Sequence, residues 1–167
     1  MLNYCYGWDW DARGDFDGEH SLEAKAFDAN GNVAISAIKV KVDNTRPTVT
    51  VFNPAPGEII RGTIAVGFEA KDAGVGVQKV ELLADGFRTN KARSISPVQP
   101  LVGGSFDYDT AVLQNGPHTL GVKAYDAHGL SSIAAVTVMV SNGVANQPPV
   151  VDAGPNQTIT LPAGTEV

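Results

Sequence analysis

The chain has 167 residues, of which 43% are hydrophobic and 18% charged, and its formal net charge at pH 7 is −6. This is the composition of a globular protein rather than a disordered tail. The acidic charge and the lack of any Lys/Arg run exclude nucleic acid as a partner, because such a surface repels phosphate backbones. No stretch reaches the roughly 18 apolar residues of a membrane helix, so we expect no membrane insertion.

Residues 1–44 repeat later in the chain with a constant offset. The segment DGEHSLEAKAFDANGNV at 17–33 returns as NGPHTLGVKAYDAHGLS at 115–131, so His20 and His118 are 98 residues apart. A period without slippage indicates one structural unit used twice, and a unit of about 100 residues fits a seven-stranded β-sandwich. Residues 1–44 match only its last three strands. We therefore expect a truncated domain: a three-stranded antiparallel sheet, open to solvent on its aromatic side.

Four aromatic side chains share one face of the first of these expected strands: Tyr4, Tyr6, Trp8 and Trp10. Such a strip could stack on a carbohydrate. However, Trp8 and Trp10 align with Phe106 and Tyr108, whose alternation places them in a core. The pattern favours core residues over a glycan site.

Residues 46–142 contain the complete unit. Short apolar runs of period two, separated by Gly, Pro, Asn and Asp, predict strands at 47–52, 64–70, 77–84, 106–108, 118–124 and 136–140. Asp85-Gly86 is typical of a tight hairpin turn. Pro97 and Pro100 interrupt the polar stretch 88–104, which we interpret as a variable loop with at most one weak edge strand.

After Asn142 the repeat ends. Residues 143–149, with Pro148-Pro149, have the composition of a stiff linker. Residues 150–167 predict the first strands of another β domain, cut off at Val167.

Several of these strings resemble bacterial immunoglobulin-like (Big-type) repeats of surface and secreted proteins. The resemblance rests above all on Gly116-Pro117-His118-Thr119-Leu120 and on the segment 123–129, KAYDAHG. The segment 146–158, NQPPVVDAGPNQT, resembles the opening of a PKD-type domain. The resemblance implies an all-β fold of tandem immunoglobulin-like (fibronectin III-like) β-sandwiches, with the first and last units truncated. It is specific for fold and weak for function, because such modules serve many roles.

No motif for an enzyme stands out: the sequence lacks HExxH, GxSxG and CxxC, and the acidic residues fall in turns. We therefore predict a non-catalytic protein without catalytic or cofactor-binding residues. His20 and His118 are in phase with inward side chains, and we expect each to bond a backbone carbonyl rather than a metal.

Calcium is the one cofactor that the sequence leaves open. Asp28, Asn30 and Asn32 place oxygen ligands at alternate positions around a glycine, as calcium loops do. Asp43 lies at the domain junction, where an ion could stiffen a rod. Against a metal, a hairpin turn with Asp or Asn before Gly needs no ion to explain it, and the equivalent turn at Asp126 lacks both Asn ligands.

The pattern favours a structural role: a spacer, stalk or adhesin segment of a bacterial extracellular or cell-surface multidomain protein, with neighbouring domains as partners. Two alternatives remain open: a module that binds a glycan or a surface protein, and an accessory domain of a secreted hydrolase. We expect the protein to be secreted or held at the cell surface, with its export signal outside this stretch.

Overall fold

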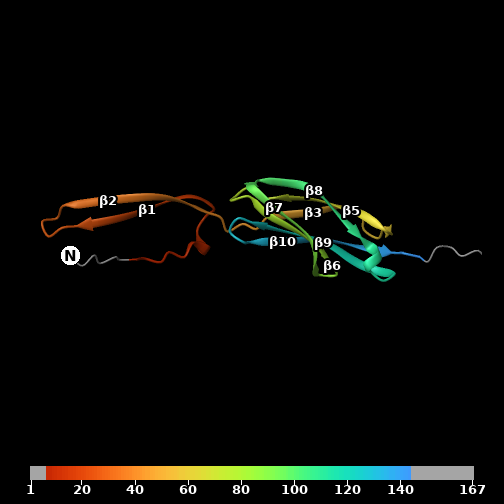
Figure 1. Cartoon of the computed structure of the whole chain (residues 1–167). Helices are drawn as coiled ribbons and strands as arrows, with labels where there is room; N and C mark the ends of the chain where they lie inside the picture. The colour runs from red at the N-terminus through yellow and green to blue at the C-terminus, as the bar shows by residue number, and fades with distance from the viewer. Residues whose placement is uncertain (1–6, 144–167) are drawn as a thin grey trace, which may run out of the picture.

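The computed structural model describes residues 7–143. Two β units lie end to end in an elongated arrangement: a hairpin near the N-terminus and a larger sandwich beyond it (Figure 1). No helix in this described part of the chain has the length and apolar character needed to cross a bilayer. The expected truncated domain at 150–167 and almost all of the expected linker at 143–149 lie outside the described residues.

The first unit is a two-stranded hairpin. A 3₁₀ turn, η1 (Ala12–Gly14), precedes strands β1 (Gly18–Phe27) and β2 (Val33–Val42), which pair antiparallel. The prediction of three strands was wrong for the described residues, since the segment that carries Trp8 and Trp10 is not a strand. Its counterpart in the second unit, strand β8, pairs with β5 in the opposite sheet and not with β9. Within residues 7–47 of the described chain, no strand equivalent to β5 is present to receive the backbone hydrogen bonds of this segment.

The second unit is a sandwich of two sheets, which are antiparallel except for one short parallel pair. One sheet has the order β3-β5-β8, and the other the order β4-β10-β9-β6-β7, in which the two-residue β4 runs parallel to β10. This is the arrangement of immunoglobulin-like and fibronectin III-like domains, and it confirms the expected all-β fold. The elements are β3 (Thr48–Asn53), β4 (Ile59–Ile60), β5 (Thr63–Lys71), β6 (Val77–Ala84), β7 (Phe87–Gln99), β8 (Leu101–Asp109), η2 (Thr110–Val112), β9 (Gly116–Asp126) and β10 (Ser131–Val140).

Residues 88–104 are not a loop, contrary to the sequence-based expectation. They form most of β7 and the start of β8, and β6 and β7 are joined by the two-residue turn Asp85-Gly86. Strand β7 is at the edge of its sheet, where Pro97 can be accommodated because an outward-facing backbone position needs no N–H donor. Proline therefore marked an edge strand here rather than the absence of a strand.

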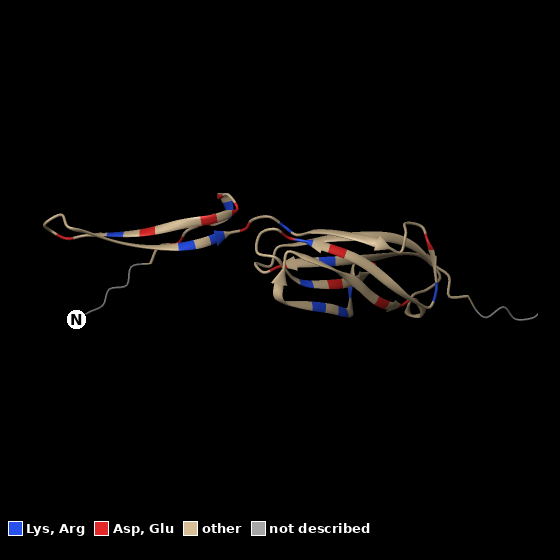
Figure 2. Ribbon diagram, turned by 90° about the horizontal axis from the view of Figure 1, so that it is seen from above, with Lys and Arg blue, Asp and Glu red and all other residues tan. Residues whose placement is uncertain are grey.

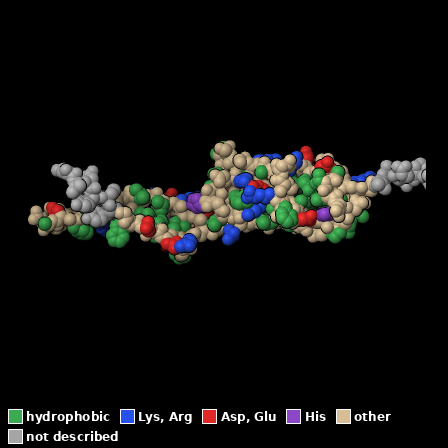
Figure 3. All heavy atoms as spheres, turned by 60° about the horizontal axis from the view of Figure 1, so that its bottom comes forward, with side chains coloured by type: hydrophobic (Ala, Val, Ile, Leu, Met, Phe, Trp, Pro, Cys, Tyr) green, Lys and Arg blue, Asp and Glu red, His purple; other side chains and the backbone are tan. Residues whose placement is uncertain are grey.

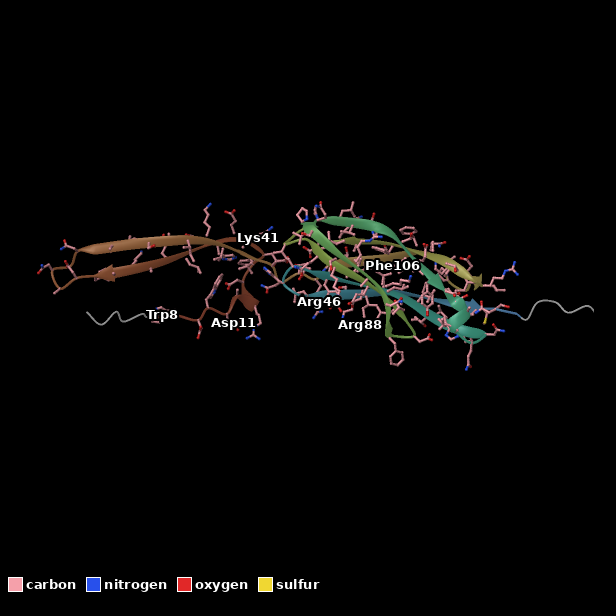
Figure 4. All side chains as sticks on the ribbon, in the orientation of Figure 1. Trp8, Asp11, Lys41, Arg46, Arg88 and Phe106 are labelled. Atoms are coloured by element: carbon pink, nitrogen blue, oxygen red, sulfur yellow. The ribbon has the colours of Figure 1, made fainter. Side chains whose placement is uncertain are left out.

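The hydrophobic core lies between the two sheets of the sandwich. The rings of Phe68 and Phe106 stack there with their centroids 5.1 Å apart. Figure 4 labels Phe106 in the sandwich. Leu120 and Val122 on β9 are fully buried, and in the register of the sheet Leu120 lies opposite Val136 of β10. The sequence-based prediction that Leu120 and Val122 of β9 face the core is thus confirmed.

The sequence repeat is also a structural repeat. Asp11 caps η1 and Asp109 caps η2, each through a hydrogen bond from the backbone two residues on. His20 contacts the carbonyl oxygen of Phe16 at 2.7 Å, and His118 contacts that of Gln114 at 2.8 Å. All of these partners are offset by the same 98 residues. The expected histidine–carbonyl contacts are present at both positions.

Candidate functional site at the junction

A short connector, residues 43–47, joins β2 to β3 and is bound to the sandwich. Lys41 Nζ donates a hydrogen bond to the carbonyl oxygen of Gly74 at 2.5 Å, and the Arg46 guanidinium donates to that of Ser131 at 2.8 Å. Figure 4 shows Lys41 and Arg46 at this passage between the two units. Pro47, which follows, is buried. The connector is therefore held at several points rather than free.

Asp43 opens the connector, and its carboxylate is buried against the sandwich. The residue is only 5% exposed. Its Oδ1 accepts from the N–H of Thr45 at 3.1 Å, and its Oδ2 accepts from the N–H of Val75, in the loop between β5 and β6, at 2.7 Å. Asp43 thus fixes the end of the hairpin unit to a loop of the next unit.

Asp72 and Asp126 stand at the ends of β5 and β9, on the side of the sandwich that meets the connector. Oδ1 of Asp72 accepts from the N–H of Gly76 at 2.8 Å. Oδ1 of Asp126 accepts from the N–H groups of His128 and Leu130 at 2.8 and 2.9 Å. Both residues are nine-tenths buried or more, and the Oδ2 atoms of both are buried without a hydrogen-bond partner.

These three carboxylates form one cluster, which we call the junction triad: Asp43, Asp72 and Asp126. One carboxylate oxygen from each lies within 4.8 Å of the other two. Among the described residues no Lys, Arg or His forms an ion pair with any of them. Two unit charges at this separation repel each other by about 3 kcal/mol at an effective dielectric constant of roughly 20. The cluster is therefore an electrostatically costly arrangement that a bound cation would relieve.

Gly74 leaves the space that the Asp43 carboxylate occupies. A Cβ atom built on Gly74 would overlap the carboxylate of Asp43. The loop between β5 and β6 can approach Asp43 so closely only because it carries glycine at this position.

Of the calcium candidates taken from the sequence, only Asp43 belongs to the junction triad. Asp28, Asn30 and Asn32 lie at the exposed tip of the β1–β2 hairpin. There Asp28 Oδ1 accepts from the N–H groups of Asn30 and Asn32, while its Oδ2 accepts from the Asn32 side-chain amide at 2.7 Å. Hydrogen bonds from Asn32 lower the pKa of Asp28. Both carboxylate oxygens of Asp28 thus accept hydrogen bonds within the turn. Calcium binding at this tip stays an untested prediction.

Sequence reasoning missed Asp72 and Asp126 as possible ligands. Asp126 was judged by its own loop, which lacks further oxygen side chains, whereas the partners come from elsewhere in the chain. The sequence does contain a signal, which is the position of each aspartate relative to a strand. Asp72 and Asp126 stand at the ends of two strands that run toward the same end of the sandwich, and Asp43 follows the last strand of the preceding unit.

A second polar cluster lies on the sandwich surface, around the buried carboxylate of Glu81. It pairs with Lys79 and with Arg88 and accepts from the hydroxyl of Tyr125 at 2.9 Å. Burial raises the pKa of Glu81, but the bonds from Lys79 and Tyr125 and the charge of Arg88 outweigh it, so that the pKa falls below its ordinary value. This carboxylate is fully paired, unlike the junction triad. Figure 2 shows such mixed charges along the strands of both units.

The hairpin exposes an apolar face, visible as hydrophobic side chains along its length in Figure 3. Trp8 is 96% exposed and Trp10 42%, and the two line a shallow groove with Leu22 and Ile38. At an offset of 98 their counterparts in the second unit, Phe106, Tyr108, Leu120 and Val136, are all core residues. The apolar face of the hairpin therefore corresponds to the core-facing side of a sandwich sheet, and no second sheet covers it among the described residues.

Comparison with known proteins finds a family that is similar to the sandwich. Residues 47–122 match the family model described as bacterial Ig domain. Among curated proteins, the dyslexia-associated protein KIAA0319 homolog of Mus musculus is 35% identical over 71 residues, a match that covers 40% of this chain and 6% of the mouse protein. The chain thus spans a small part of that relative.

Two solved structures are partly similar to this chain. The endo-beta-1,4-mannanase from Thermotoga petrophila is 19% identical with a TM-score of 0.46, over 60% of this chain and 21% of the mannanase. The fibronectin(III)-like modules of Clostridium thermocellum CbhA are 19% identical with a TM-score of 0.44, over 58% of this chain and 100% of theirs.

Proposed function

We propose that this chain, whose central sandwich matches the bacterial Ig domain family over residues 47–122, is a non-catalytic spacer segment of an extracellular or cell-surface bacterial protein. Bacterial Ig domains typically occur in extracellular proteins, and such domain families are typically not catalytic. The tandem repeat at an offset of 98 residues supports the role, because repeated modules extend a chain by a fixed length per unit.

The observation that carries this proposal is the bound connector. Lys41 and Asp43 bond the Gly74-Val75 loop, and Arg46 bonds the carbonyl oxygen of Ser131. A spacer transmits position only if the angle between its modules is restricted, and contacts on two sides of a short connector restrict it. The end-to-end arrangement in Figure 1 is the shape that such a role requires.

Distance measurements between spin labels test this restriction. We would place labels at Asn30→Cys, on the hairpin tip, and Thr137→Cys, on an exposed position of β10, in a chain carrying Cys5→Ser. A restricted junction gives one narrow distance distribution. A distribution as broad as that of a flexible linker would contradict the spacer role.

A matched set of variants removes two of the contacts at the connector without touching the core of the sandwich. Lys41→Ala together with Asp43→Ala should broaden the distribution, whereas Lys39→Ala, an exposed residue paired only with Glu19, should not. Retardation of the unlabelled chain in polysaccharide-containing gels would instead favour the alternative of a glycan-binding module.

A further inference from the structure

We propose that the junction triad of Asp43, Asp72 and Asp126 binds a calcium ion that bridges the hairpin unit and the sandwich. Two features of the described residues lead to this site. Three buried carboxylates converge from three separate segments, with one oxygen of each within 4.8 Å of the others. In addition, Asp72 Oδ2 and Asp126 Oδ2 are buried without a hydrogen-bond partner.

The unpartnered oxygens point to a ligand because a buried polar atom without a partner is rare and unfavourable. A water molecule could donate hydrogen bonds to both of them, yet it would leave the repulsion among three carboxylates in place. A cation satisfies the oxygens and neutralises the charge together. The other Asp72 and Asp126 oxygens already accept backbone N–H groups, which hold both carboxylates in fixed orientations.

The donor chemistry selects calcium. All three side chains offer oxygen, and neither a cysteine nor a histidine belongs to the cluster, so a zinc-like site is not favoured. Calcium takes six to eight oxygen ligands in flexible geometry and can fill its remaining positions with backbone carbonyls and water, whereas magnesium requires a near-ideal octahedron. Sites of this kind on extracellular modules have a Kd on the order of 10⁻⁴ to 10⁻³ M.

Because the three ligands come from both units, an ion bound to them would link the hairpin unit to the sandwich. Asp43 directly follows strand β2 of the hairpin unit, whereas Asp72 directly follows β5 and Asp126 ends β9 of the sandwich. A bound ion would therefore add a bond across the connector, next to the hydrogen bond from Val75 to Asp43. Calcium should narrow the angular range of the junction as well as stabilise the sandwich.

The test is a thermal melt and a calorimetric titration of the full chain, first stripped with a chelator, with calcium chloride at constant ionic strength. We expect one site per chain. At ten to a hundred times Kd, calcium should raise the folding equilibrium constant about 10- to 100-fold, and Tm by roughly 5–10 °C. Magnesium at the same concentration should raise Tm by much less.

Asp126→Asn and Asp28→Asn form a matched pair of variants, 98 residues apart. In each, the asparagine Oδ1 can still accept the two backbone N–H groups of its turn. Asp126→Asn thereby loses only the charge, whereas Asp28→Asn also loses the hydrogen bond from the Asn32 side-chain amide. Asp126→Asn should weaken calcium binding at least about 10-fold, and so should Asp72→Asn. Asp28→Asn should leave binding unchanged.

The sign of the stability change separates a metal ligand from a structural aspartate. In chelator, Asp126→Asn should be at least as stable as the wild type, because it relieves repulsion; in calcium it should be less stable. Destabilisation by the same amount in both conditions overturns the proposal. A Tm that calcium does not change would also overturn the proposal, and so would a loss of calcium binding in Asp28→Asn alone. If magnesium raises Tm as much as calcium does, the choice of calcium as the ion is wrong.

Calcium binding and the spacer role can fail separately. The titration reports the ion alone, while the spin-label distances report the junction with or without it. A broad distribution in both calcium and chelator would contradict the spacer role and leave a measured calcium site in place.

Discussion

The two copies of the repeat share their local structure and differ in their burial. Leu120 in the sandwich is fully buried, while its counterpart Leu22 in the hairpin is half-buried. Val136 is 6% exposed and its counterpart Ile38 60%. The turns, caps and strand pairing are nevertheless the same in both. Local sequence therefore determines the hairpin and its turns, and the facing sheet determines whether its apolar side is a core.

The largest effect should come from comparing Leu120→Ala with Leu22→Ala. Truncating the fully buried Leu120 should lower the free energy of unfolding of the sandwich by about 2–4 kcal/mol, because it leaves a cavity between the sheets. Leu22→Ala should cost less than about 1 kcal/mol, since that side chain faces a surface already open to solvent. Chemical denaturation of both variants measures the difference.

Lys123→Ala serves as the surface control on β9, with an expected cost under about 0.5 kcal/mol. Lys123 lies over the ring of Tyr125, 4.7 Å from its centroid, on the outer face of the sheet. Equal effects of Leu120→Ala and Lys123→Ala would contradict the assignment of inner and outer faces.

The junction should respond to a methyl group at Gly74. Gly74→Ala places a Cβ where the Asp43 carboxylate lies, and should destabilise the chain by roughly 1–3 kcal/mol through overpacking. In an Asp43→Ala background the same change should cost much less, since the space is then free. A double-mutant cycle from denaturation melts in chelator measures this coupling, and purely additive effects would show that the loop does not pack on Asp43 in solution.

In chelator, removing residues 1–44 should change the Tm of the sandwich by only a few degrees. Residues 46–142 contain both sheets and the whole core cluster of the described sandwich, so we expect them to unfold cooperatively as a single two-state unit. The deletion should also reduce self-association, because it removes the exposed apolar face of the hairpin. Thermal melts and light scattering test both expectations. A large loss of stability would mean that the hairpin completes the core of the sandwich.

Much of the fold could be predicted from local patterns, because hairpin turns and alternating strands depend on residues close together in sequence. The turn at Asp85-Gly86 and the inward phase of Leu120 are examples. Long-range pairing could not be predicted in the same way. Strand β7 was missed because Pro97 argues against a strand except at an edge, and edge position is a property of the folded sheet.

The candidate site shows the same limit. Asp43 drew attention because it stands at a junction, but Asp72 and Asp126 become its neighbours only when β5 and β9 end at the same side of the sandwich. Neither the spacing of the three residues nor the loop around Asp126 reveals this. A search for aspartates that terminate strands directed toward one end would have found them.

The smallest expected effect concerns the two histidines, which share one contact and differ in another. Both bond the carbonyl oxygen of the residue four positions earlier, but only His118 also has a carboxylate: its Nδ1 lies 2.7 Å from Asp85 Oδ2. With acceptors at both ring nitrogens, the doubly protonated imidazole keeps two hydrogen bonds and the neutral ring only one. The hydrogen bond to Asp85 chiefly raises the pKa of His118, with a smaller contribution from Gln114, against the effect of burial.

The pair should therefore stabilise the sandwich over a limited pH range. The contribution of His118, whose pKa is raised on folding, is full below about pH 6.5 and is lost as the pH rises through the folded value. Bonds from Thr119 and His118 lower the pKa of Asp85, so its contribution is full above about pH 4 and is lost as the pH falls through the folded value. The window is about pH 4 to 6.5.

Asp85→Asn tests this window, because asparagine tolerates the positive φ of 51° at this position and can still accept the N–H of Thr119. We expect the variant to lower the His118 pKa in an NMR titration and to lose more stability at pH 5.5 than at pH 8. An unchanged His118 titration would show that the carboxylate does not hold the ring in solution. A loss of stability that is equal at both pH values would assign the role of Asp85 to its bond with Thr119 and to the turn, leaving the two histidines equivalent.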